Sequence, residues 1–220
     1  MIELPDYSKS WDYENNFYLS ADVTRFSKLL AHYELFKEVN ELPGHVVECG
    51  VFKGASLVRF AAFRDLLGSP YAKKIIGFDT FDTFPETLYP TDVAVREKFV
   101  RDAGAQSIGA DQLREVLARQ HHDRHVELVE GDITQTVPEY VEANPELRIS
   151  LLNLDTDVYE PAKVILEQLY PRIVPGGLLV LDDYGTFPGE TDAVDEYFAD
   201  TRVKIEKLPL ATTPAFIRKP

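Results

Sequence analysis

Two stretches of the sequence place carboxylates directly after apolar runs that are typical of buried strands. LLNLDTDVYEP carries Asp155 and Asp157, and GGLLVLDD ends in Asp182 and Asp183. Converging carboxylates at neighbouring strand ends repel one another unless a cation neutralises them. Mg²⁺ binds a few carboxylate oxygens and keeps positions for water and substrate oxygens. The pattern therefore predicts a magnesium site formed by Asp155, Asp182 and Asp183.

The sequence leaves another interpretation of these acids open. One or more of them would then face solvent, or pair with a basic residue such as Lys53 or Arg59. An EF-hand calcium loop matches poorly, because Tyr159 and Glu160 stand where that loop carries Asp or Asn and then Gly.

A glycine-containing loop, GVFKGAS, follows the first apolar run of the chain. Gly50 and Gly54 allow the backbone to approach a ligand closely, and the helix that follows offers free N–H groups. The loop lacks both GxGxxG and GK[ST], which argues against a dinucleotide site and a P-loop. On its own, the loop indicates a ligand site of undefined class.

Two further acids follow apolar runs. Asp79, after IIGF, is placed to accept hydrogen bonds from a ribose diol, as an acid at that position does in dinucleotide folds. Asp132 follows Gly131 and is placed to accept a hydrogen bond from the amino group of a base. The alternative for each is a structural role, as the cap of a turn or a helix.

The elements that must position these residues alternate along the chain. Strands are predicted over residues 45–50, 73–79, 125–132, 148–155 and 176–183. Helical spacing of apolar residues occurs over 21–40, 54–67, 109–121, 158–173 and 190–199. This order predicts an α/β fold with a parallel sheet and right-handed crossovers. The last two apolar runs, VKIEKLPL and TPAFIRK, predict an antiparallel hairpin at one edge. Ligands of such sheets bind beyond the carboxyl ends of the strands, where the candidate residues cluster.

Composition limits the classes of function. The 220 residues suit one domain, and the net charge of −14 disfavours nucleic acid and anionic membranes as partners. Cys49 is the only cysteine, so no intrachain disulfide forms. The sequence shows neither a signal peptide nor an apolar run of about 18 residues, the length that a membrane helix needs. We therefore expect a cytoplasmic protein.

Six motifs follow one another along the chain: VVECGVFKGAS, IIGFDTFDTFPE, VEGDITQTVPEY, LLNLDTDVYEP, PGGLLVLDDYG and AVDEYF. In this order and spacing they resemble the macrocin and mycinamicin type of sugar O-methyltransferases, from roughly Arg25 to the C-terminus. The combination of LDxDxYE with PGG…DDY carries most of the specificity. The resemblance implies S-adenosylmethionine and Mg²⁺ as cofactors, and a hydroxyl of a sugar or sugar-containing natural product as methyl acceptor.

The resemblance also implies a Rossmann-like class I methyltransferase fold: a mostly parallel seven-stranded sheet with an antiparallel last strand and helices on both faces. It implies that Glu48 lies near the methionine part of the cofactor, which the next loop would hold through Gly50, Val51, Phe52, Gly54 and Ser56. Asp79 would hold the ribose and Asp132 would lie near the adenine. Asp155, Asp182 and Asp183 would bind the metal.

Methyl transfer to a hydroxyl requires removal of a proton from a poor acid. Asp155 is the first candidate for this base and Asp157 the second, although a helix cap is the favoured interpretation of Asp157. Tyr159 is expected at the rim of the site, by packing or by one hydrogen bond. Tyr184 is a candidate for acceptor contact, or simply an aromatic at a strand end.

The expected single domain, 1–220, contains two further features. Residues 1–40 form an aromatic segment and a helix, which would pack onto the rest of the protein or contact a second copy in a homo-oligomer. Residues 81–108, rich in aromatic residues and proline, are predicted to form a lid over the acceptor.

Three other functions are weighed against a sugar methyltransferase. A metal-dependent methyltransferase of a catechol or other small diol shares the fold and the metal site. An aspartate-nucleophile phosphatase is suggested by LNLDTDV, but that motif normally opens the chain. A non-catalytic S-adenosylmethionine-binding module would not need the metal acids.

Overall fold

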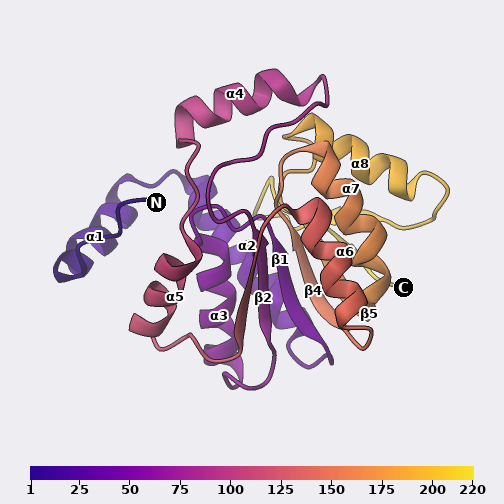
Figure 1. Ribbon diagram of the computed structural model, residues 1–220. Helices are drawn as coiled ribbons and strands as arrows, with labels where there is room; N and C mark the ends of the chain where they lie inside the picture. The colour runs from indigo at the N-terminus through magenta and orange to yellow at the C-terminus, as the bar shows by residue number, and fades with distance from the viewer.

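The computed structural model describes residues 1–220, and a seven-stranded sheet runs through its centre (Figure 1). The strands are β1 (His45–Cys49), β2 (Ile75–Asp79), β3 (Val126–Glu130), β4 (Ile149–Leu154), β5 (Ile173–Leu181), β6 (Ile205–Lys207) and β7 (Ala215–Arg218). Their order across the sheet is β3-β2-β1-β4-β5-β7-β6. The strands β1 to β5 pair in parallel, and β7 is antiparallel to both β5 and β6. The predicted parallel sheet and the antiparallel hairpin at its edge are confirmed.

Helices cover both faces of this sheet (Figure 1). They are α1 (Ser10–Ser20), α2 (Val23–Val39), α3 (Ala55–Leu67), α4 (Asp92–Ala103), α5 (Ala110–Arg119), α6 (Ile133–Ala143), α7 (Tyr159–Gln168) and α8 (Pro188–Phe198). One apolar core joins one face of the sheet to α6, α7 and α8, and a second joins the other face to α2, α3 and α5. Because side chains alternate along a strand, the central strand β4 serves both cores: Leu151 packs in one and Leu152 in the other.

Two helices contribute little to these cores. None of the residues of α1 is buried, and Asp92 is the only buried residue of α4. Both helices project from the main body, and α4 lies above the carboxyl ends of the strands (Figure 1). No helix combines the length and the apolar character that crossing a membrane requires.

The structure differs from the predicted elements near the start of β5. The helix expected over 158–173 ends at Gln168, and a 3₁₀ turn at Tyr170–Arg172 leads directly into the strand. Pro171 explains the early end, since proline lacks the N–H that would continue an α-helix.

Candidate active site

A cavity of about 820 Å³ opens at the carboxyl ends of the five parallel strands, as expected for a sheet of this topology. Its wall contains nine of the residues singled out in the sequence: Gly50, Val51, Phe52, Ser56, Asp79, Asp132, Asp155, Asp157 and Asp183. Five others lie outside the lining: Glu48, Gly54, Asp182, Tyr159 and Tyr184. The structure therefore gathers most of the candidate residues around one space.

The loop after β1 is held in place by Asp79. One carboxylate oxygen accepts hydrogen bonds from the backbone N–H groups of Val51 and Phe52, at 2.8 and 2.9 Å. The other accepts one from the backbone N–H of Phe81, at 2.7 Å. Asp79 thus fixes the loops after β1 and β2, in addition to any contact that it makes with a ligand.

Two glycines in this loop are required by geometry. Gly50 has a φ of +92°, and a Cβ there would stand 1.7 Å from the carbonyl oxygen of Asp155. Gly54 has a φ of +82° and begins α3, and a Cβ there would press on Leu113. The first glycine therefore allows the loops after β1 and β4 to touch, although Gly54 itself does not line the cavity.

Glu48 lies in β1 and is fully buried. One of its oxygens accepts a hydrogen bond from the side chain of Asn153 at 3.1 Å, and the other has no partner. Burial raises the pKa of Glu48 to about 8. The side chain is therefore protonated at neutral pH, and it lies beneath the cavity wall.

Asp132 caps a helix. Its carboxylate accepts hydrogen bonds from the backbone N–H and the hydroxyl of Thr134, at 2.9 and 2.8 Å, in the first turn of α6. This is the structural alternative that the sequence left open. Because Asp132 also lines the cavity, a ligand contact is compatible with the cap.

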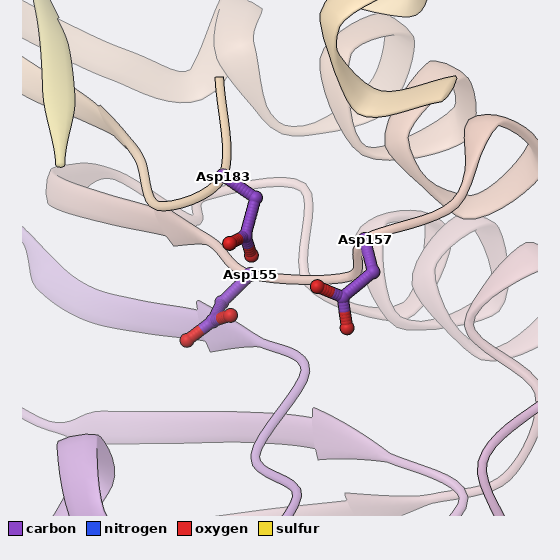
Figure 2. Close-up of side chains that lie close together, drawn as sticks. All are labelled: Asp155, Asp157 and Asp183. Carbon is purple, nitrogen blue, oxygen red and sulfur yellow. The ribbon is translucent and has the colours of Figure 1, made fainter. Parts of the chain in front are cut away.

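Three carboxylates converge at the ends of β4 and β5. Oxygens of Asp155, Asp157 and Asp183 lie within 4.8 Å of one another. Figure 2 shows the three side chains projecting into the same space. Burial, followed by repulsion from neighbouring carboxylates that include Asp182, raises the pKa of each carboxyl well above its usual range. A set of converging carboxyl oxygens whose ionised forms repel one another fits a hard divalent cation such as Mg²⁺.

Asp157 is not a helix cap. The helix α7 begins at Tyr159, and its N-cap residue is Val158, which makes no side-chain cap; the backbone N–H of Tyr159 bonds to Asp92 instead. Asp157 has a φ of +65°, an unfavourable backbone conformation for a residue with a side chain. The favoured sequence interpretation of this residue was therefore wrong, and its side chain joins the acid cluster instead.

Asp182 is placed differently from the predicted metal set. Its carboxylate is fully buried, bonds to the ammonium of Lys28, and lies 3.2 Å from Nε2 of His32. Side chains alternate along β5, so Asp182 faces the same way as Val180, toward α2, whereas Asp183 faces the cavity. The acid cluster thus contains Asp157 where the sequence predicted Asp182.

The sequence interpretation missed Lys28 and His32. Although burial opposes it, Asp155, Asp182 and Asp183 together raise the pKa of Lys28. Burial lowers the pKa of His32, which stacks on Phe60. A signal was present, because Lys28 and His32 stand four residues apart and therefore share one face of α2.

Tyr159, expected at the rim of the site, and Tyr184, a candidate for acceptor contact, both bond to α8. The hydroxyl of Tyr159 donates to Glu196 at 2.6 Å, and that of Tyr184 donates to Asp195 at 2.7 Å. The ring of Tyr159 also stacks on Tyr89, with 4.3 Å between ring centroids. Both tyrosines support the elements around the site and lie outside the cavity lining.

The segment predicted as a lid contributes to the cavity wall, including Phe84, Glu86, Leu88 and Phe99. Hydrogen bonds attach this segment to α7 and α8. The buried carboxylate of Asp92 accepts hydrogen bonds from the backbone N–H groups of Tyr159 and Gly189, at 3.0 and 2.7 Å.

A second fastening of this segment involves Glu160. Its carboxylate accepts hydrogen bonds from the hydroxyl of Thr87 and the backbone N–H of Leu88, at 2.9 and 3.0 Å. The segment is therefore held against α7 and α8 by two sets of hydrogen bonds.

The strand order, the antiparallel β7 and the cavity beyond the parallel strands define a class I, Rossmann-like methyltransferase fold. A crystal structure of CalS11, a calicheamicin methyltransferase, superimposes with a TM-score of 0.78 at 28% sequence identity, covering 99% of this chain and 94% of that one. The chain belongs to the macrocin-O-methyltransferase (TylF) family, which it matches over residues 23–219.

Curated relatives act on natural products. The chain is 30% identical over 158 residues, 71% of its length, to the 8-demethyl-8-(2,3-dimethoxy-alpha-L-rhamnosyl)-tetracenomycin-C 4'-O-methyltransferase of Streptomyces olivaceus. It is 28% identical over 162 residues, again 71% of its length, to the mycinamicin III 3''-O-methyltransferase of Micromonospora griseorubida. The chain spans 58% and 61% of the lengths of these two relatives.

Proposed function

We propose that this protein is an S-adenosylmethionine- and Mg²⁺-dependent O-methyltransferase that acts on a hydroxyl of a sugar or a sugar-containing natural product. The observation that carries the proposal is the acid cluster of Asp155, Asp157 and Asp183, set in the wall of a cavity that is also lined by the loop after β1. Family membership supports the reaction class, and the activities for which the relatives are named support a glycosylated acceptor.

The loop after β1 is proposed to hold the cofactor. Gly50 and Ser56 line the cavity there, and Asp79 keeps the loop in place through two backbone hydrogen bonds, from Val51 and Phe52. Asp132 lies on the same wall. In this proposal Asp79 contacts the ribose and Asp132 lies near the adenine, while Glu48 supports the loop from below.

The acid cluster is proposed to hold the metal and to receive the proton. When bound, the two cofactors would supply an electrophilic methyl group and a Lewis acid that lowers the pKa of the acceptor hydroxyl. Asp155 is the proposed base and Asp157 the second candidate, since both line the cavity. The lid segment excludes water from this space, and Lys28 limits the repulsion among the acids.

Calorimetric titration with S-adenosylhomocysteine, with and without Mg²⁺, tests this proposal. We expect micromolar affinity, which corresponds to about −8 kcal/mol. A screen of glycosides, nucleotide-linked sugars and catechols then identifies the acceptor class. Asp79→Ala removes the proposed contact with the ribose, and it should weaken S-adenosylhomocysteine binding by roughly 2–4 kcal/mol. If S-adenosylhomocysteine did not bind at millimolar concentration, the proposed methyltransferase activity would be refuted. If only catechols were turned over, the acceptor would be a catechol instead of a sugar.

A further inference from the structure

Glu190 is a buried acid that no basic side chain neutralises. It lies in the first turn of α8, and none of its surface is exposed. No lysine, arginine or histidine forms an ion pair with it. One carboxyl oxygen accepts a single hydrogen bond, and the other, Oε2, has no partner. A buried carboxyl with an unsatisfied oxygen costs free energy, so its presence at this position indicates a specific role.

The single hydrogen bond of Glu190 is to the acid cluster. Its Oε1 accepts the backbone N–H of Asp183 at 3.1 Å. The backbone carbonyl oxygen of Asp183 is also bonded, because it accepts the N–H groups of Thr186 and Phe187 at 2.8 and 3.0 Å. These bonds fix the piece of backbone from which the Asp183 side chain projects into the space that it shares with the other two acids (Figure 2).

The usual role of a glutamate near a helix start does not explain this contact. The N-cap residue of α8 is Phe187, so Glu190 is the third residue of the helix. A glutamate at that position in a capping box bonds to the backbone N–H of the N-cap residue. Here that N–H is already bonded to the carbonyl oxygen of Asp183. Glu190 therefore supports the loop after β5 rather than the start of its own helix.

The residue before Glu190 is bonded to the lid segment. The backbone N–H of Gly189 donates to the buried Asp92 at 2.7 Å. A Cβ at Gly189 would stand 1.9 Å from an oxygen of that carboxylate, so this close approach depends on glycine. Two consecutive residues of α8 thus bind the lid segment and Asp183. The first turn of α8 is therefore a fixed support against which Glu190 can hold Asp183.

We propose that Glu190 is a positioning residue for the metal site, and that it holds the backbone of Asp183 so that this carboxylate converges with the other two acids. The inference rests on the proposed methyltransferase function and adds a residue that supports a metal ligand without binding the metal. Replacing a residue in such an outer position commonly changes metal affinity by about 10–100-fold. The carboxyl oxygen acts here as a hydrogen-bond acceptor, so an amide oxygen at the same distance can replace it.

Two substitutions separate this role from an effect of charge. Glu190→Gln keeps the length and an acceptor oxygen but removes the acid. Glu190→Asp keeps the acid but shortens the side chain by one C–C bond, about 1.5 Å, which withdraws the oxygen from Asp183. A positioning role predicts that the glutamine variant keeps metal affinity and the aspartate variant loses it. A role for the negative charge predicts the reverse.

Two further variants of α8 are controls. The hydroxyl of Thr191 accepts the backbone N–H of Gly185 at 2.9 Å, so it anchors the same loop without contacting Asp183. Thr191→Val removes this anchor and is the matched control. Val194→Ala removes buried apolar atoms from the same helix and shows the effect of lower stability alone.

The measurement is the Mn²⁺ affinity of each folded protein, by electron paramagnetic resonance, with thermal melts to verify folding. We expect Glu190→Asp to lose about tenfold or more in Mn²⁺ affinity. Glu190→Gln and both controls should stay within about threefold of wild type. Amide hydrogen exchange at Asp183, in chelator, should become faster in Glu190→Asp and stay slow in Glu190→Gln. Calorimetry should give a S-adenosylhomocysteine affinity within about twofold of wild type for every variant, because the proposed cofactor loop follows β1.

Three results would overturn the proposal while leaving a methyltransferase intact. One is loss of Mn²⁺ affinity in Glu190→Gln, whatever the aspartate variant does, which would assign the effect to charge. Another is wild-type Mn²⁺ affinity in a folded Glu190→Asp protein, which would make Glu190 a structural residue only. The third is an equal loss in Thr191→Val, which would assign the effect to loop anchoring in general. Failure of wild type to bind S-adenosylhomocysteine would instead refute the underlying function.

Discussion

Adjacent aspartates at the end of β5 have different surroundings because they point in opposite directions. Asp183 faces the cavity with two other acids, whereas Asp182 faces α2 and is paired with Lys28 and His32. Removing one of three like charges relieves repulsion in the metal-free protein. Removing one partner of a buried ion pair leaves the other charge uncompensated. Substitutions at the two positions should therefore affect different properties.

We predict that Asp183→Asn weakens Mn²⁺ binding, measured by electron paramagnetic resonance, by at least about tenfold, equivalent to roughly 1.4 kcal/mol. Its melting temperature in chelator should stay constant or rise. Asp182→Asn should lower the stability by about 3–5 kcal/mol and retain more Mn²⁺ affinity. If a folded Asp182→Asn protein lost Mn²⁺ binding as fully as Asp183→Asn does, the set inferred from the sequence, which contains both residues, would be right.

Glu48 gives stability a specific dependence on pH. Its pKa rises from the ordinary value of 4.5 to about 8 in the folded protein, so the folded state binds a proton that the unfolded state has lost. The stability from Glu48 is complete below about pH 4.5 and decreases as pH rises toward 8. Glu48→Gln should remove this decrease.

The measurement is urea unfolding at pH 5 and pH 8.5 for wild type and Glu48→Gln. Relative to wild type, the variant should gain up to about 1.4 kcal/mol for each pH unit within the window. Glu139→Gln, which changes an exposed acid on α6, should follow wild type. A parallel pH dependence of all three proteins would mean that Glu48 ionises normally.

Some site residues could be predicted from the sequence and others could not. Asp79, Asp155 and Asp183 lie in the cavity wall because ligands bind where parallel strands end, and strand ends are visible in the sequence. The roles of Asp182 and Asp157 depend on how far past the strand end the side chains keep alternating between the two faces of the sheet. A shift of one position reverses the face to which a side chain points. Arg25, which also lines the cavity, comes from a distant helix, and only tertiary packing brings it to the site.

At the level of elements, the lid segment depends on Asp92. This carboxylate binds the first N–H groups of α7 and α8, so one side chain joins three helices. We predict that Asp92→Ala removes roughly 2–4 kcal/mol of lid closure. Hydrogen exchange at α4 should become faster, and the KM for the acceptor should rise with little change in S-adenosylhomocysteine affinity.

Asp102→Ala, an exposed residue near the other end of α4, is the control. Unchanged exchange in Asp92→Ala, with both proteins folded, would show that the stacked pair of Tyr89 and Tyr159 and the bonds of Glu160 suffice to hold the lid.

The main elements of the fold were predictable, and the irregular ones were less so. Short, mostly apolar runs identified the central strands β1, β2 and β4, because strands covered by helices on both faces are rich in apolar residues. The helix α4 has a polar surface and only Asp92 buried, so apolar spacing did not reveal it. Pro171 marked the end of α7, but neighbouring apolar residues on both sides obscured the change from helix to strand.

For the whole molecule, the acid cluster is part of a chain whose net charge is −14. A cation that binds only the folded state stabilises it, by about 2.7 kcal/mol at a hundredfold excess over its Kd. For a chain of this size, that corresponds to a rise of roughly 5–10 °C in melting temperature. We predict such a rise with Mg²⁺, reversed by chelator and absent in Asp183→Asn.

Sodium chloride at equal ionic strength is the control, because general screening of the negative surface also stabilises the protein. Equal shifts with Mg²⁺ and sodium chloride, in wild type and variant alike, would mean that the acids hold no specific cation.

Asp92 also has a consequence for timing. Its bond to Tyr159 fastens the lid to the residue where α7 begins, and Asp157 stands two positions earlier on the same stretch of chain. The lid and the acid cluster therefore share one support, and thermodynamic coupling between two such sites is reciprocal. We therefore expect a ligand that binds the acid cluster to favour the closed lid, and opening of the lid to weaken binding at the acid cluster. In an enzyme built in this way, one movement of the lid would both retain the substrate and release the product.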